Sequence, residues 1–261
     1  LADEGSERGG ASLAQRHAEC AVCFEDLCSM PCAVFVDGHA RRCCSHFLHE
    51  ACARALPTKA CPLCRAPFEA TRTLPSIRDD PHGWFACVDV EGDGRLSKVQ
   101  VREALVTQFP LDTSKFDGVI DTLWARWDHD GSGFVSREEF ADPDSGLLAD
   151  VRAQLLKVPR APPERVPDIA TDRNKWFDHF DEGRSGYLSQ EAVVRGLIKT
   201  YGLGTDLSQV VAMRKLVGAV WVVFDIDGTG AVSREEFLKP TDGLADAIIA
   251  SRATLNSQQC I

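Results

Sequence analysis

The stretch that decides the fold reads Cys20-x2-Cys23, then Cys44-x-His46-x2-His49-x2-Cys52, then Cys61-x2-Cys64. It holds eight side chains that bind transition metals, arranged in closely spaced pairs. Two residues of spacer let both thiolates of a Cys-x2-Cys pair reach one ion. Since a tetrahedral zinc ion takes four sulfur or imidazole ligands, the eight side chains fit two zinc ions with none left over.

The order and spacing of these ligands resemble the RING finger, in the variant whose fourth and fifth ligands are both histidine. The resemblance implies two interleaved ligand sets, a cross-brace, in which metal binding supplies most of the folding free energy of a short segment. Cys43 is an alternative to Cys44 as the third ligand, although the family's single-residue gap before the histidine favours Cys44. One ion would be held by Cys20, Cys23, His49 and Cys52, and the other by Cys44, His46, Cys61 and Cys64.

RING fingers of the ubiquitin-ligase kind bind a ubiquitin-conjugating enzyme, and the resemblance carries these contacts to Val22, Leu56, Pro62, Leu63 and Arg65. It also implies small-core aromatic residues at Phe47 and Phe68. The implied mechanism positions the ubiquitin thioester for attack by a substrate lysine, so this chain supplies no nucleophile and no catalytic residue. One departure is Leu56, where the family more often has tryptophan, because leucine leaves a smaller contact surface.

Beyond this segment the sequence repeats itself. Trp84-Phe85-x3-Asp89 recurs 92 residues later from Trp176, and Ser136-Arg-Glu-Glu-Phe recurs 97 residues later from Ser233. Internal repetition of this kind indicates duplicated structure. We expect both tryptophans to lie in cores. The expected domains are a flexible lead-in at 1–17, the RING module at 18–70, a first unit at 80–158, a proline-rich hinge at 159–168 and a second unit at 169–252.

Each unit contains two segments that resemble EF-hand calcium loops. That motif needs oxygen ligands at loop positions 1, 3, 5, 7 and 9, glycine at 6 and a bidentate glutamate at 12. Two loops comply, so the resemblance implies two calcium ions. The ligands would be Asp128, Asp130, Ser132, the Phe134 carbonyl and Glu139 in one, and Asp225, Asp227, Thr229, the Ala231 carbonyl and Glu236 in the other. Val135 and Val232 take position 8, where paired hands form a short strand contact.

The first loop of each unit is defective. Loop 89–100 retains Asp89, Glu91 and Asp93 but has Gln100 at position 12, where a neutral amide gives no bidentate charged contact. A third calcium ion there would bind weakly at most. Loop 181–192 has glycine at position 3 and alanine at position 12, and we expect no calcium in it. Both defective hands would serve as structural partners of the intact ones.

Charge and composition exclude several classes of function. Residues 1–75 carry nine acidic and eight basic side chains, and the remainder carries 30 and 21, which gives most of the net charge of −10. An acidic second half without a basic aromatic face argues against nucleic-acid binding. The longest apolar stretch, 216–224, is too short to span a membrane. Five cysteines beyond the ligand set form an irregular group, which indicates a reducing compartment, the cytoplasm or nucleus.

The sequence therefore predicts a small zinc-bound cross-brace RING module followed by all-α EF-hand domains in two paired units. The function that this combination implies is a RING-type ubiquitin ligase whose calcium-binding EF-hands regulate it or recruit a protein substrate. Its partners would be a ubiquitin-conjugating enzyme, ubiquitin, a substrate and an amphipathic helix bound by opened EF-hands. The alternative is a non-enzymatic calcium-binding adaptor with a structural zinc module.

Overall fold

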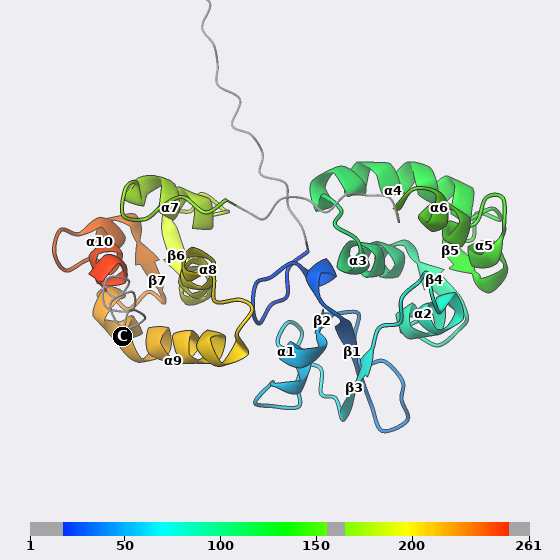
Figure 1. Cartoon of the computed structure of the whole chain (residues 1–261), viewed down its shortest axis with the longest axis horizontal. Helices are drawn as coiled ribbons and strands as arrows, with labels where there is room; N and C mark the ends of the chain where they lie inside the picture. Colours follow the sequence, from blue (N-terminus) through cyan, green and yellow to red (C-terminus); the bar gives the residue numbers. More distant parts are fainter. Residues whose placement is uncertain (1–17, 156–164, 251–261) are drawn as a thin grey trace, which may run out of the picture.

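The computed structural model describes residues 18–155 and 165–250 of the chain. The predicted lead-in, residues 159–164 of the predicted hinge, and Cys260 lie outside these residues. Three parts follow one another: the metal-ligand module (residues 18–74), a first EF-hand unit (residues 80–155) and a second EF-hand unit (residues 169–250). In Figure 1 the module, in blue, lies between the first unit, in green, and the second, in yellow to red.

The metal-ligand module is built on a three-stranded antiparallel sheet in the order β2-β1-β3. Its elements are η1 (Leu27–Ser29), β1 (Cys32–Val36), β2 (Leu48–His49), α1 (Glu50–Arg54) and β3 (Ala70–Thr73). Every residue of β1 is buried. Phe35 packs against Phe68 with ring centroids 4.5 Å apart, and Phe47 is buried beside them in the same core, so the two aromatic residues expected in a small core lie there. The predicted metal ligands therefore lie in and between the segments that this small sheet connects.

The first EF-hand unit begins at a well-defined helix start. Asp80 accepts a hydrogen bond from the Gly83 N–H, and Pro81 occupies the first helical position, where its missing N–H costs nothing. Ser97 and Ser136 form capping boxes with Gln100 and Glu139. The elements are α2 (Pro81–Val88), β4 (Arg95–Ser97), α3 (Lys98–Gln108), α4 (Thr113–Trp127), β5 (Phe134–Ser136), α5 (Arg137–Ala141) and α6 (Leu147–Ala153).

The second EF-hand unit repeats this order, as the sequence duplication predicts. Its elements are α7 (Arg173–Phe180), β6 (Tyr187–Ser189), α8 (Gln190–Tyr201), α9 (Leu207–Phe224), β7 (Ala231–Ser233) and α10 (Arg234–Leu238). Helices α5 and α10 are only five residues long. Each stops just before an X-Pro pair, Asp142-Pro143 and Lys239-Pro240, because the residue before proline is disfavoured in helical conformation.

Each EF-hand unit has its own aromatic core, and the two cores match. Trp84 stacks on Phe140 at 5.8 Å between centroids, and Trp176 stacks on Phe237 at 5.2 Å. Both tryptophans are fully buried, so their predicted role as core residues is confirmed. Within each unit the two loops are joined by a short antiparallel strand pair, β4 with β5 and β6 with β7.

Helix α9 departs from the sequence expectation. We expected no segment able to span a membrane, but this 18-residue helix is long and apolar enough to do so by length and composition. One such helix is weak evidence for a membrane span. Here α9 packs along α8, with Val210 and Val217 buried. None of the ten cysteines in the described part of the chain forms a disulfide.

Candidate metal centres

The eight predicted ligands of the metal-ligand module come together in two groups of four. Within each group, all ligand atoms lie within 4.8 Å of one another. The groups are Cys20, Cys23, His49 and Cys52, and Cys44, His46, Cys61 and Cys64. These are the interleaved sets that the RING resemblance implies. Cys44 belongs to the second group and Cys43 does not. The Cys43 N–H donates to the carbonyl of Phe35 in β1.

The two Cys-x2-Cys pairs have the same backbone geometry. Phe24 N–H donates to the Cys20 carbonyl at 2.8 Å, and Arg65 N–H donates to the Cys61 carbonyl at 2.8 Å. Phe24 and Arg65 both have positive φ, 60° and 63°, which is uncommon for residues other than glycine. The same strained turn at both sites brings each pair of thiols onto one side of the backbone, as binding one ion requires.

In the first group, all four side chains are buried. His49 Nε2 lies 3.1 Å from the Asp26 carbonyl, which can only accept, so Nε2 carries the proton and Nδ1 faces Cys23 Sγ at 3.2 Å. Burial lowers the pKa of His49, but hydrogen bonds and charge from Cys20 and Cys23 outweigh it and raise that pKa to about 10. Hydrogen bonds from Cys23 and Cys52 lower the pKa of the Cys20 thiol. Three cysteine sulfurs around an oriented imidazole form a donor set that suits a soft divalent cation.

The second group is more open than the first. Cys64 is exposed, Cys44 and His46 are half-buried, and Cys61 is buried. Desolvation raises the pKa of the Cys44 thiol to about 12. His46 Nδ1 is buried and has no hydrogen-bond partner among the described residues. A buried polar nitrogen without a partner is costly, and a metal ion at this position would satisfy it. The donor sets of both groups therefore fit zinc.

The five residues predicted to contact a conjugating enzyme lie on both ligand loops and after α1. Val22 and Leu56 are half-buried against the module's core. The turn between Cys61 and Cys64 is exposed, with Leu63 retaining 53% of its accessible surface. The remaining two, Pro62 and Arg65, are exposed beside it.

Loop 128–139 brings its predicted calcium ligands together. The carboxylate oxygens of Asp128, Asp130 and Glu139 lie within 4.8 Å of one another. Ser132 Oγ donates to the Phe134 carbonyl at 3.2 Å, which places that carbonyl on the inner side of the loop. Gly133 has φ of 84°, the turn that position 6 requires of glycine. The loop therefore presents the oxygen-rich cage that calcium prefers.

Loop 225–236 has the same hydrogen-bond pattern. Gly230 N–H donates to Asp225 Oδ2 at 2.9 Å, and Thr229 Oγ1 donates to the Ala231 carbonyl at 3.0 Å. Glu236 accepts from the Ser233 N–H and hydroxyl, each at 2.8 Å. In the described residues, the carboxylates of Asp225, Asp227 and Glu236 are not gathered as closely as those of the other loop.

The two defective loops retain the shape but not the ligands. Gly94 and Gly186 N–H groups still donate to Asp89 and Asp181, at 2.8 and 2.7 Å. In loop 89–100, the Gln100 amide donates to the Glu91 carboxylate, so its nitrogen occupies the side where a calcium ion would need an oxygen. These hands are paired to the intact ones through β4 and β6.

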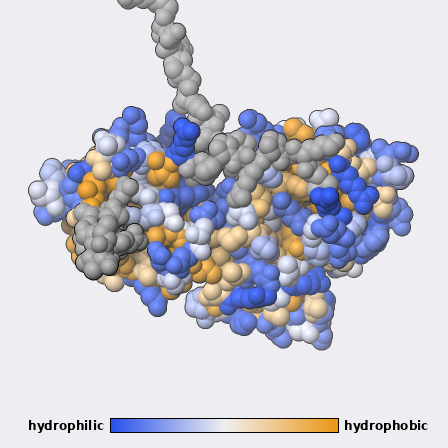
Figure 2. Space-filling view, viewed as in Figure 1, coloured by the Kyte–Doolittle hydropathy of each residue, from blue (hydrophilic) through white to orange (hydrophobic). Residues whose placement is uncertain are grey.

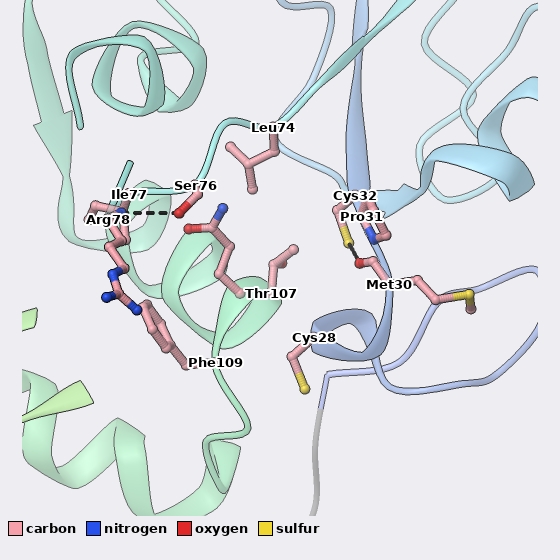
Figure 3. Close-up of a pocket in the computed structure, with 11 residues that line it drawn as sticks. Cys28, Met30, Pro31, Cys32, Leu74, Ser76, Ile77, Arg78, Thr107 and Phe109 are labelled. Carbon is pink, nitrogen blue, oxygen red and sulfur yellow. Dashed lines mark hydrogen bonds between the residues drawn. The ribbon is translucent and has the colours of Figure 1, made fainter. Parts of the chain in front are cut away.

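A cavity of about 340 Å³ lies where the metal-ligand module meets α3, and sequence reasoning missed it. Figure 3 shows its lining from both parts, with Met30 and Cys32 on one side and Thr107 and Phe109 on the other. Cys32 Sγ donates to the Leu27 carbonyl at 3.2 Å, and burial raises the pKa of this thiol to about 12, so it is a poor nucleophile. Nothing in the sequence pattern signals this cavity, because it depends on how the two parts pack.

Comparison with known proteins finds one family profile that matches this chain and several similar proteins. The EF-hand family profile matches residues 127–142, which contain the intact loop of the first unit. The chain is 36% identical over 70 residues to the polcalcin Bet v 4 of Betula pendula and 34% identical over 70 residues to the polcalcin Aln g 4 of Alnus glutinosa. Each match covers 26% of this chain and 78% of the polcalcin.

A second kind of relative is the human peptidyl-prolyl cis-trans isomerase FKBP7, 34% identical over 61 residues. That match covers 22% of this chain and only 28% of the relative. The profile match lies outside residues 20–64, so the RING resemblance rests on ligand spacing and on the geometry of the two ligand groups.

Proposed function

This chain belongs to the EF-hand family, and from that premise we propose that it is a calcium-regulated, RING-type ubiquitin ligase that acts in the cytoplasm or nucleus. In this proposal, calcium binds at loops 128–139 and 225–236, and zinc binds at the two ligand groups of the module. Bound zinc would hold the module's fold. The partners are a ubiquitin-conjugating enzyme with its bound ubiquitin and a protein substrate.

The observation that carries the ligase proposal is the interleaving of the two ligand groups. Cys52 lies in α1, between His46 and Cys61 of the second group in sequence, yet its thiol belongs to the first group. This arrangement ties loops distant in sequence into one face, with exposed Leu63 and Arg65 on it. A rigid face of this kind suits a function that depends on positioning. Leu63 would supply an apolar contact and Arg65 a positive charge to the conjugating enzyme and ubiquitin.

The test is autoubiquitination by the full chain with a panel of conjugating enzymes. Val22→Ala and Arg65→Ala should each reduce ubiquitin-chain formation by about ten-fold, the effect of losing roughly 1.4 kcal/mol of contact. Arg41→Ala is the matched control, because Arg41 is exposed and, among the residues that the structure describes, its side chain pairs with Asp37 alone. Ubiquitin-chain formation that ignored both substitutions would remove these contacts from the proposal.

A non-enzymatic calcium-binding adaptor is the second candidate, and one observation favours it. Leu56, already smaller than the family's usual tryptophan, is half-buried against the core rather than offered to a partner. Under this alternative, zinc and calcium would bind as proposed, but no conjugating enzyme in the panel would give ubiquitin chains.

For the calcium-dependent step, the second EF-hand unit offers an apolar cavity of about 90 Å³ between α8 and α9. Its lining includes Met213, Trp221 and Ile248. Opening of this cavity on calcium binding would let it receive an amphipathic helix. We expect calcium to change the tryptophan fluorescence and to raise the binding of an apolar dye. An unchanged spectrum together with unchanged dye binding would contradict a calcium switch.

A further inference from the structure

An ion-pair cluster joins the second EF-hand unit to the first zinc loop, which is the segment around Cys20 and Cys23. Arg195 Nε and Nη2 donate to the two Glu19 carboxylate oxygens at 2.9 and 3.0 Å. Lys199 Nζ donates to Glu19 Oε1 at 2.7 Å. All three side chains are at most 22% exposed, so the pairs are shielded from solvent more than ordinary surface ion pairs. Glu19 directly precedes the ligand Cys20, and both bases lie on α8.

A third basic residue, Arg214 on α9, reaches the same loop. Its Nη2 donates to the carbonyl oxygens of Ala21 and Val22, at 3.0 Å each. Its guanidinium lies 5.0 Å from the centroid of the Phe24 ring, in cation–π geometry. In Figure 1 the connection between α8 and α9 lies beside the blue ligand loop. Figure 2 shows hydrophilic and hydrophobic residues mixed over this face of the molecule. The loop between Cys20 and Cys23 is therefore covered by the second unit.

The duplication shows that this contact is particular to the second unit. At the 92-residue offset, Arg195 and Lys199 correspond to Glu103 and Thr107 of the first unit. At the 97-residue offset, Arg214 corresponds to Asp117. Glu103 and Asp117 both pair with Arg102 inside their own unit. An acidic or neutral residue thus stands at each position where the second unit has a base that contacts the module.

We propose that the second EF-hand unit inhibits the module by holding its first zinc loop through Arg195, Lys199 and Arg214. This proposal rests on the proposed function, in which Val22 contacts the conjugating enzyme. The Val22 carbonyl accepts a hydrogen bond from Arg214 and Val22 is half-buried, so the second unit competes with a conjugating enzyme for this loop. The contact is non-covalent, so a change in the second unit can release it. Helix α9 ends at Phe224, directly before the calcium ligand Asp225, which links the contact to the calcium loop.

The contact itself can be tested without any assay of ligase activity. A carbodiimide, which joins a carboxylate to a neighbouring amine, should cross-link Glu19 to Lys199 in the full chain, as mapped by mass spectrometry. Lys199→Gln should abolish this cross-link. Absence of the cross-link in the wild-type chain would overturn the proposal.

The inhibitory role is tested by the affinity of the full chain for a conjugating enzyme. Arg195→Glu with Lys199→Glu places two acids beside Glu19, and we expect binding to tighten by about ten-fold or more. Adding Glu19→Lys to this double variant reverses the charge of all three residues in the Glu19 pairs and should restore the weaker affinity. Arg102→Ala, in the first unit, is the matched control and should leave affinity unchanged. The zinc content of every variant must equal that of the wild type.

The outcomes separate the two proposals. Equal affinity in the wild type and the double variant overturns the inhibitory role and leaves the ligase function intact. Absence of binding in the wild type and in every variant overturns the ligase function, and with it the inhibitory role. Tighter binding that the third substitution fails to reverse also overturns the inhibitory role, because the gain then comes from something other than the Glu19 pairs.

Discussion

Leu188 and Val232 face each other across the strand pair of the second EF-hand unit, and both are completely buried. Leu188 belongs to the loop with no glutamate at position 12, and Val232 belongs to the intact calcium loop. Leu96 and Val135 have the same relationship in the first unit. In each unit, a buried residue of the defective hand therefore packs against the hand that retains the calcium ligands.

From this pairing we predict that Leu188→Ala weakens a calcium site to which it contributes no ligand. Truncating a buried leucine costs about 2–5 kcal/mol of unfolding free energy. The cavity would also loosen β7 and lower the calcium affinity of loop 225–236. Urea unfolding and calcium titration of the full chain measure the two effects. Tyr187→Ala, at an exposed neighbouring position, should change neither quantity appreciably.

Calcium stoichiometry should follow the residue at loop position 12. Glu139→Gln and Glu236→Gln should each remove one of two bound ions, because an amide gives no bidentate charged ligand. Gln100→Glu should have the opposite effect and add an ion at loop 89–100, where Asp89, Glu91 and Asp93 are already present. Native mass spectrometry with calcium counts the ions directly. Two ions retained by Glu139→Gln would contradict the ligand assignment.

Two adjacent cysteines provide a matched test of the zinc sites. Cys44→Ser should reduce the zinc content of the purified chain from two ions to one, because Cys44 lies in the second ligand group. Cys43→Ser should retain both ions, since Cys43 lies outside that group. A chelator should unfold the metal-ligand module, as expected when metal binding supplies its folding free energy. Equal loss of zinc from both variants would contradict the assignment.

The start of α9 should make stability depend on pH. Asp206 caps this helix, and hydrogen bonds from Ser208 and Gln209 hold the pKa of its carboxyl below the usual value. A carboxyl whose pKa is lower in the folded state stabilises that state above the unfolded pKa of about 3.9, and the contribution is lost as the pH falls through the folded pKa. Asp206→Asn should therefore reduce the fall in urea midpoint between about pH 5 and pH 3. An unchanged slope would show that another group is responsible.

The sequence alone was enough for features in which covalent spacing fixes the geometry. The Cys-x2-Cys pairs and the twelve-residue loops are local, so a few residues at set intervals determine where ligand atoms can lie. The same holds for the duplication and for the buried tryptophans. The sequence alone was insufficient for α9. Its arginine and lysine interrupt the apolar residues, so the apolar stretch looked shorter than the continuous helix that the structure has.

Only the tertiary structure decided how the parts meet. Glu19 and Lys199 are 180 residues apart, and no local pattern links them. Their contact depends on how α8 and α9 pack on the loop around Cys20 and Cys23. It distinguishes two units whose repeated sequences are similar. The structure likewise separates Cys44 from Cys43, because only the Cys44 thiol lies with His46, Cys61 and Cys64. Long-range packing therefore determines which of the two similar units contacts the metal-ligand module.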